Sequence, residues 1–128
     1  MNRREARILA MQYVFQMEAQ KDFQPSGLES FLCEKNAKEQ KQYITCTINA
    51  VCDNIQSIDA AIEDKSQGWS IQRMAKADLA ILRTAAAEIL YDSSIPKSVS
   101  INEAVELAKA YGDEKSSGFI NAVLKNIG

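Results

Sequence analysis

The segment that decides the fold is Ile95–Leu124, which reads IPKSVSINEAVELAKAYGDEKSSGFINAVL. Apolar residues recur within and just after it at helical spacing, in two stripes separated by Gly112. Ser100 and Glu103 have the S-x-x-E spacing of a capping box, in which each side chain binds a free backbone amide at a helix start. Gly112 is expected to end the first helix in a left-handed conformation. The two stripes, which predict a packed pair of helices, are Ile101, Ala104, Val105, Ala108 and Tyr111, and Ile120, Val123, Leu124 and Ile127.

Upstream of this segment, helical spacing recurs wherever the chain is apolar. A first helix is predicted from Arg3 to about Gln20, and a second from about Ser26 to Lys35. A third segment has apolar residues at alternating steps of four and three, which favours a helix although residues 43–48 alone could be read as a strand. Ser57 or Asp59 is expected to divide this segment into two helices by capping the second. Its apolar residues are Ile44, Ile48, Val51, Ile55, Ile58 and Ile62.

Residues 65–69 are predicted to form the hinge between the two halves of the chain. Ser70 is expected to cap a long helix that reaches about Tyr91, with Trp69 packed on Met74 as a hydrophobic staple. With the pair described first, these segments predict an all-α protein of about seven helices and no strand.

Length and composition fit one globular domain. A chain of 128 residues that is 46% hydrophobic is long and apolar enough to bury a core. We expect a single domain over residues 1–128, built from two packed helical bundles of about residues 1–66 and 70–128. The longest apolar run is only a few residues, so neither a transmembrane span nor a signal peptide is predicted.

Several kinds of chemistry find no support in the sequence. Histidine, the commonest general base and metal ligand, is absent, as are glycine-rich phosphate loops and the G-x-S-x-G motif. Cys33, Cys46 and Cys52 are an odd number without C-x-x-C spacing, a pattern typical of a reducing cytoplasm rather than of disulfides or a zinc site. Capping and solvation explain Glu103 and Glu106 better than catalysis does. We therefore expect a cytoplasmic protein that is not an enzyme, with no catalytic residue, no metal and no cofactor.

Charge is unevenly distributed along the chain. The net charge of −2 is not typical of a nucleic-acid-binding protein. The arginines of the first half, Arg3, Arg4 and Arg7, nevertheless all lie at the extreme N-terminus. On a helix they fall within an arc of about 100°, where guanidinium groups can offer paired donors to phosphates. The alternative is an ordinary solvated helix end.

Phe119 lies at the start of the last predicted helix, shortly after Lys115 and Ser116. An aromatic ring in such a position can stack on an unpaired base while the neighbouring lysine and hydroxyl hold the RNA backbone. The alternative is core packing, because Val123 lies one helical turn further on. An intermediate position, with one ring face against Val123 and the other open to RNA, would satisfy both.

Three blocks of the sequence resemble one known family. They are RREAR at residues 3–7, DLAILR at residues 78–83, and V-x-INEAVELAK-x-YG-x-x-K-S-x-x-FINAVL at residues 99–124. In this order, and over nearly the whole chain, they resemble the NusB family of bacterial transcription antitermination factors. The resemblance implies binding of the boxA element of ribosomal RNA leader transcripts. It also implies a heterodimer with the small-subunit ribosomal protein NusE, in a complex that loads onto RNA polymerase.

The resemblance further implies roles for individual residues. The expected RNA-binding residues are Arg3, Arg4, Arg7, Lys115, Ser116 and Phe119, and the expected partner-binding residues are Phe15 and Asp78. Arg83 is expected to be structural and to pair with an acid of the next helix, because a buried guanidinium needs a carboxylate.

Two other functions compete with this interpretation. The first is the NusB-like domain fused to ribosomal RNA cytosine methyltransferases, which would need a long catalytic extension beyond Gly128. The second is a helical adaptor or homodimer without an RNA role, which the apolar first helix fits as well. Beyond the first 20 residues the chain carries no net positive charge. We therefore expect RNA binding to be weak without the protein partner.

Overall fold

The computed structural model describes residues 1–128 and contains seven α-helices, three short 3-10 helices and no strand. The α-helices are α1 (Arg3–Gln20), α2 (Leu28–Glu34), α3 (Lys41–Asp53), α4 (Ile55–Lys65), α5 (Lys76–Tyr91), α6 (Lys97–Tyr111) and α7 (Ser116–Leu124). The 3-10 helices are η1 (Pro25–Gly27), η2 (Lys38–Gln40) and η3 (Ile71–Arg73). The predicted all-α class with about seven helices is confirmed. None of these helices combines the length and the hydropathy needed to cross a membrane.

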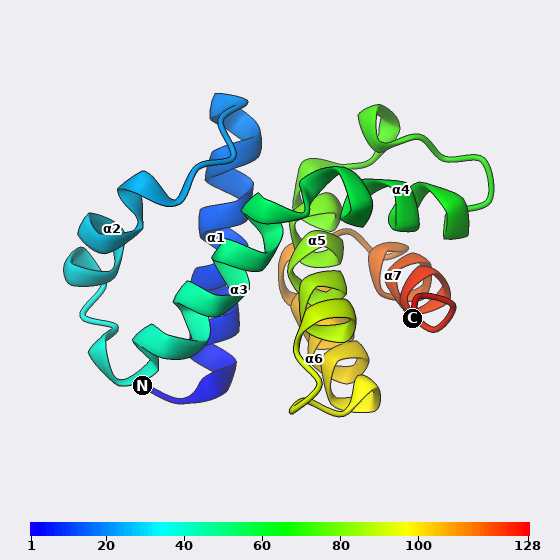
Figure 1. Cartoon of the computed structure of the whole chain (residues 1–128). Coiled ribbons are helices and arrows are strands. Elements are labelled where there is room, and N and C mark those ends of the chain that lie inside the picture. The colour runs from blue at the N-terminus through cyan, green and yellow to red at the C-terminus, as the bar shows by residue number, and fades with distance from the viewer.

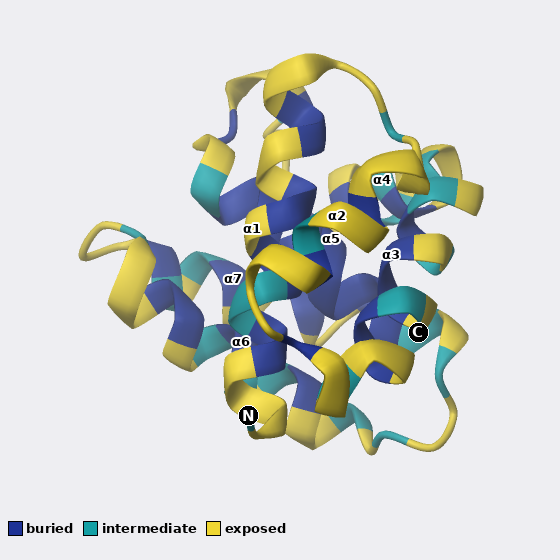
Figure 2. Ribbon diagram, turned by 90° about the vertical axis from the view of Figure 1, so that its left-hand side faces the viewer, coloured by how far each residue is buried: buried dark blue, intermediate teal, exposed yellow.

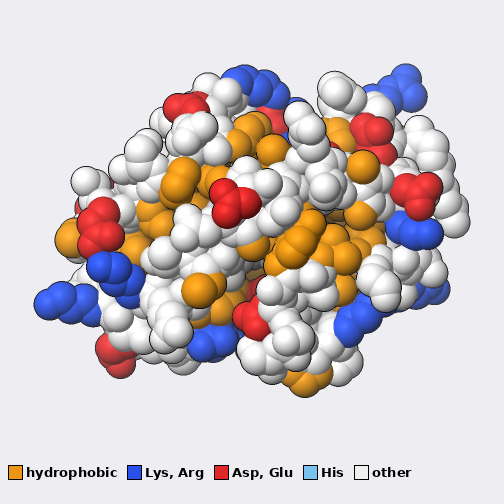
Figure 3. All heavy atoms as spheres, viewed as in Figure 1, with side chains coloured by type: hydrophobic (Ala, Val, Ile, Leu, Met, Phe, Trp, Pro, Cys, Tyr) orange, Lys and Arg blue, Asp and Glu red, His pale blue; other side chains and the backbone are white.

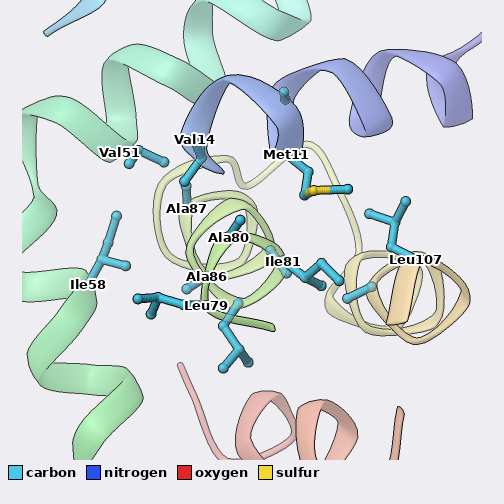
Figure 4. Packing of buried hydrophobic residues seen from close by; sticks show 14 of the residues in the cluster. Met11, Val14, Val51, Ile58, Leu79, Ala80, Ile81, Ala86, Ala87 and Leu107 are labelled. Carbon is cyan, nitrogen blue, oxygen red and sulfur yellow. The ribbon is translucent and has the colours of Figure 1, made fainter. Parts of the chain in front are cut away.

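Helix α5 is the centre of the molecule, and α1, α3, α4, α6 and α7 all pack against it (Figure 1). Every residue from Asp78 to Glu88 is buried, as expected of a helix surrounded by others. Small side chains at Ala80 and at residues 85–87 allow the neighbouring helices to approach closely. Figure 4 shows side chains of α1, α3, α4 and α6 converging on α5 from several sides.

One hydrophobic cluster of 31 buried residues forms the core, and exposed positions lie on the outer faces of the helices (Figure 2). Helices α1–α4 lie within the predicted first bundle, and α5–α7 lie within the second. Because α5 also packs on α1, α3 and α4, the two groups share this core. The division of the chain into two helical bundles, at about residues 1–66 and 70–128, therefore stays a prediction.

The predicted helix from Ser70 to Tyr91 is wrong in its first part. Residues 71–73 form η3 instead, and α5 begins only at Lys76. Glu63 of α4 accepts a hydrogen bond from the Ile71 backbone N–H at 2.8 Å, which holds η3 against the end of α4. Ser70 makes no capping hydrogen bond. Because α5 begins only at Lys76, Trp69 and Met74 both precede the helix and cannot form a staple across its start.

The isoleucine-rich segment forms α3 and α4 as predicted, but the break lies at Asn54 rather than at Ser57 or Asp59. The backbone of Asn54 departs from helical geometry (φ −128°, ψ 24°), and its side-chain amide donates to the Ala50 carbonyl at 3.0 Å. The apolar seam is largely buried on both sides of this break.

The start and the end of α6 differ from the predicted capping pattern. The helix begins at Lys97, after Pro96, and it has no capping side chain. Ser100 therefore lies inside the helix, and its capping box with Glu103 does not form. Gly112 ends α6 in an extended rather than a left-handed conformation (φ −100°). A glycine is required there for space, since a Cβ atom would lie 2.4 Å from the Ser116 Oγ.

Candidate nucleic-acid interface

A capping box that was not predicted from the sequence fixes the start of α1. The Asn2 side chain accepts a hydrogen bond from the Glu5 backbone N–H at 2.8 Å, and the Glu5 carboxylate accepts one from the Asn2 N–H at 3.1 Å. Both partners satisfy amides that a helix start leaves free. The box fixes the turn of helix that carries Arg3 and Arg4.

Arg3 is exposed and has no carboxylate partner. Its Nε donates to the Gln40 side chain at 2.8 Å, and its guanidinium lies 4.4 Å from the centre of the Tyr43 ring. The side chain borders an open hollow of about 530 Å³ between α3 and the end of α5, which Tyr91 also lines. Neutral groups thus orient Arg3 at the surface, and no carboxylate of the protein pairs with it.

Arg4 is also at the surface but is paired with Glu103 of α6. Its Nε and Nη2 donate to the two oxygens of that carboxylate at 3.0 and 2.7 Å. The hydrogen bond from Arg4 holds the pKa of Glu103 below its usual value, so this carboxyl is ionised at neutral pH. The Arg4 side chain remains 65% exposed, and that of Glu103 only 16%.

Arg7 does not lie at the exposed helix end that the sequence predicted, because it is only 6% exposed. Its Nε and Nη2 donate to Glu88 of α5 at 2.9 and 3.1 Å. The same carboxylate accepts hydrogen bonds from the Tyr43 and Ser100 hydroxyls. Burial and the negative charge of Glu88 raise the pKa of Tyr43, which therefore stays a hydrogen-bond donor. Arg7 belongs to this buried network, and its exposure was predicted wrongly.

The second predicted cluster lies at the start of α7. Lys115 is exposed and Phe119 is half-buried against the core. Ser116, by contrast, is only 2% exposed, and its Oγ accepts a hydrogen bond from the Asp113 backbone N–H at 2.9 Å. Its hydroxyl therefore orders the turn between α6 and α7, and the expectation of an accessible Ser116 is wrong. Phe119 has the intermediate burial that a mixed position requires.

The two clusters are not linked to each other by polar contacts. No hydrogen bond or ion pair joins Arg3 or Arg4 to Lys115 or Phe119. Both clusters border α6, since Glu103 pairs with Arg4 and α7 packs along the same helix. On the face shown in Figure 3, lysines and arginines are scattered among acidic and apolar side chains and form no continuous basic surface. On this face, an RNA contact would therefore have to combine separate local groups.

The two predicted partner-binding residues lie in different environments. Phe15 is 43% exposed and lines a groove of about 210 Å³ that also includes Lys76, at the start of α5. Asp78, two residues further on, is only 8% exposed, and its Oδ1 has no hydrogen-bond partner. Asp78 is therefore buried, and the prediction of a surface acid at this position is wrong.

Asp78→Asn is expected to raise the melting temperature at pH 7. Burial raises the pKa of Asp78, and the carboxylate of Asp113 adds to this. Because the folded state then disfavours the ionised form, this group contributes stability below about pH 4 and loses it as the pH rises. The gain from asparagine should accordingly shrink when melting is followed down to about pH 4. A lower melting temperature at pH 7 would instead show that the charge is needed.

Arg83 is structural, as predicted, but its partners are not on the next helix. The side chain is 2% exposed and donates to both oxygens of Asp59 in α4 at 2.8 Å. Its Nη1 donates to Glu18 of α1 at the same distance. Burial alone would raise the pKa of Glu18, but hydrogen bonds from Lys21 and Arg83 hold this pKa below its usual value. The acids thus come from two helices that precede α5.

The remaining polar groups suggest no further chemistry. No group of three or more aspartate, glutamate or cysteine side chains is arranged to hold a metal ion. The three cysteines are free, and burial raises the pKa of the Cys52 thiol to about 11.

The fold and the exposed clusters define a small all-helical binding protein. The model of the NusB family matches residues 4–128. The transcription antitermination protein NusB of Alkaliphilus oremlandii is 44% identical over 125 residues, which cover 97% of this chain and 91% of the relative. That of Bacillus mycoides is 41% identical over 128 residues, which cover 99% and 97%. The chain belongs to the NusB family of transcription antitermination proteins. The resemblance and the prediction of a protein that is not an enzyme are both confirmed.

Solved structures of the same family share the fold. T. maritima NusB has a TM-score of 0.90 and 34% sequence identity, and the match covers 99% of this chain and 90% of that chain. A complex of the antitermination factors NusB and NusE with double-stranded RNA contains a chain with a TM-score of 0.85 and 28% identity, covering 98% and 94%.

Proposed function

We propose that this protein binds the boxA RNA of ribosomal RNA leader transcripts together with the ribosomal protein NusE. The joint complex would act on RNA polymerase in the cytoplasm and suppress premature termination. The observation that carries the RNA part is the placement of Arg3 and Arg4 on the capped first turn of α1, exposed and with fixed guanidinium orientations. The solved NusB–NusE–RNA complex, which has the same fold, supports both partners.

Within this proposal the RNA-binding residues are Arg3, Arg4, Lys115 and Phe119. Arg7 and Ser116 are buried, so we assign them the task of holding the exposed residues in place. The exposed Phe15 and its groove support a protein-binding surface at the junction of α1 and α5. A homodimer that uses the same surface is the alternative, and it predicts a concentration-dependent mass in sedimentation.

Replacing Arg3 and Arg4 together with alanine is expected to weaken RNA binding without unfolding the protein. Two phosphate contacts would be lost, so the slope of log affinity against log salt should fall by about 1.4 for a single strand. Fluorescence anisotropy with labelled boxA RNA at several salt concentrations, with and without NusE, measures this.

Arg73→Ala is the matched control, because Arg73 is exposed in η3 and forms no ion pair. A scrambled RNA of equal length controls for sequence preference. If the double variant binds boxA RNA as tightly as the parent does, the proposed RNA surface at α1 is wrong.

A further inference from the structure

The N-terminal arginines are largely neutralised by carboxylates of the protein itself. Glu88 of α5 holds Arg7, and Glu103 of α6 holds Arg4. A Glu103 oxygen also lies 3.9 Å from Nη1 of Arg7. Two cations therefore face two anions, and only Arg3 lacks a carboxylate partner.

The two ion pairs differ in how easily RNA can reach them. Arg7 and Glu88 are buried, with side chains only 8% and 2% exposed, and are thus closed to a phosphate. Arg4 is mostly exposed, but two of its three guanidinium nitrogens already donate to Glu103. A phosphate that approaches Arg4 meets the remaining donors and, within a few ångströms, the negative charge of Glu103. At that separation, well under the screening length of about 8–10 Å, like charges repel appreciably.

We propose that Glu103 competes with RNA phosphate for Arg4 and thereby lowers the intrinsic RNA affinity of the free protein. The inference rests on the proposed function and concerns the regulation of that same surface. A phosphate binds Arg4 fully only when the guanidinium turns away from Glu103 or donates hydrogen bonds to both anions at once. The free energy needed to weaken the Arg4–Glu103 pair is offset when a second surface, such as that of the protein partner, holds the same RNA strand.

Burial favours this role for Glu103 over that of an ordinary surface acid. Its side chain is only 16% exposed and accepts two hydrogen bonds from Arg4, so the carboxylate stays close to that guanidinium. Glu106, one helical turn further along α6, is 53% exposed and pairs only with Lys109 at 3.5 Å. The two residues carry the same charge on the same helix, which makes Glu106 a matched control.

Glu103→Gln is expected to bind boxA RNA about 2- to 5-fold more tightly than the parent at low salt, as expected from the usual strength of one exposed ion pair. The difference in affinity should shrink as the salt concentration is raised, because salt screens the repulsion between Glu103 and the phosphate. Glu106→Gln should give a smaller gain. In an Arg4→Ala background, Glu103→Gln should no longer change the affinity, because the contested cation is gone. Circular dichroism verifies that each variant is folded, and Glu103→Ala should show the same gain.

Unchanged or weaker RNA binding by both Glu103 variants would overturn the inference, and so would an equal gain for Glu106→Gln. The inference fails alone if the parent binds RNA through Arg4 but the Glu103 variants give no gain. If the parent does not bind boxA RNA, or binds it independently of Arg3 and Arg4, the proposed function fails and this inference fails with it.

Discussion

Glu88→Ala is expected to lower the free energy of unfolding by about 3–5 kcal/mol, the cost of removing one partner of a buried ion pair. Glu88 lies on α5 and accepts hydrogen bonds from Arg7, Tyr43 and Ser100, which lie on α1, α3 and α6. Without the carboxylate, the guanidinium of Arg7 stays buried with only the longer contact to Glu103. Two hydroxyl groups also lose their acceptor inside the core.

Urea unfolding followed by circular dichroism measures this loss. Glu88→Gln should fall between the parent and the alanine variant, because an amide keeps an acceptor oxygen but no charge. Glu106→Ala, an exposed glutamate on α6, should change stability by less than about 0.5 kcal/mol. If Glu88→Ala lowers the free energy of unfolding by less than about 1 kcal/mol, the hydrogen-bond network around Glu88 does not hold the four helices together.

Phe119→Ala is expected to affect both stability and RNA binding. A fully buried phenylalanine would cost about 3–5 kcal/mol on truncation. Phe119 is only half-buried, so we expect a loss of about 1–2 kcal/mol of stability. If the open face of the ring stacks on a base, RNA affinity should fall roughly 5- to 150-fold, the equivalent of about 1–3 kcal/mol.

Phe119→Leu separates the two effects. Leucine retains most of the apolar volume against the core but has no ring, so stability should recover while RNA affinity stays low. Denaturant unfolding and RNA titration on the same preparations give both quantities. A strongly destabilised Phe119→Ala variant with normal RNA affinity per folded molecule would identify Phe119 as a core residue alone.

The sequence predicts the number and class of the helices because apolar periodicity is a local property. Helix α1 and the α3–α4 segment follow that periodicity closely. The helix starts are less predictable, since a capping side chain competes with other partners that become visible only in three dimensions. Ser100 shows this: it has the spacing of a cap, but its hydroxyl donates to Glu88 of another helix.

The site is less predictable than the fold for a related reason. Helical spacing places Arg3, Arg4 and Arg7 near one another, but it does not reveal which carboxylates lie opposite them. A signal for the missing network exists in α5, where two charged residues, Arg83 and Glu88, interrupt a largely apolar stretch. Charged residues inside a buried helix require partners of opposite charge. Their partners on α1, Arg7 and Glu18, lie more than 60 residues earlier in the sequence. The spacing of residues within one helix therefore could not identify them.

The two ion pairs that join α1 to α5 have opposite polarity. Near its start, α1 contributes the cation, Arg7, to Glu88, whereas near its end it contributes the anion, Glu18, to Arg83. If α1 docked in the reversed direction, arginine would face arginine and glutamate would face glutamate in the core. Such like-charge contacts cost several kcal/mol, roughly. The alternating polarity therefore fixes the direction and register in which the first helix docks, a selection that an apolar interface of the same area would not provide.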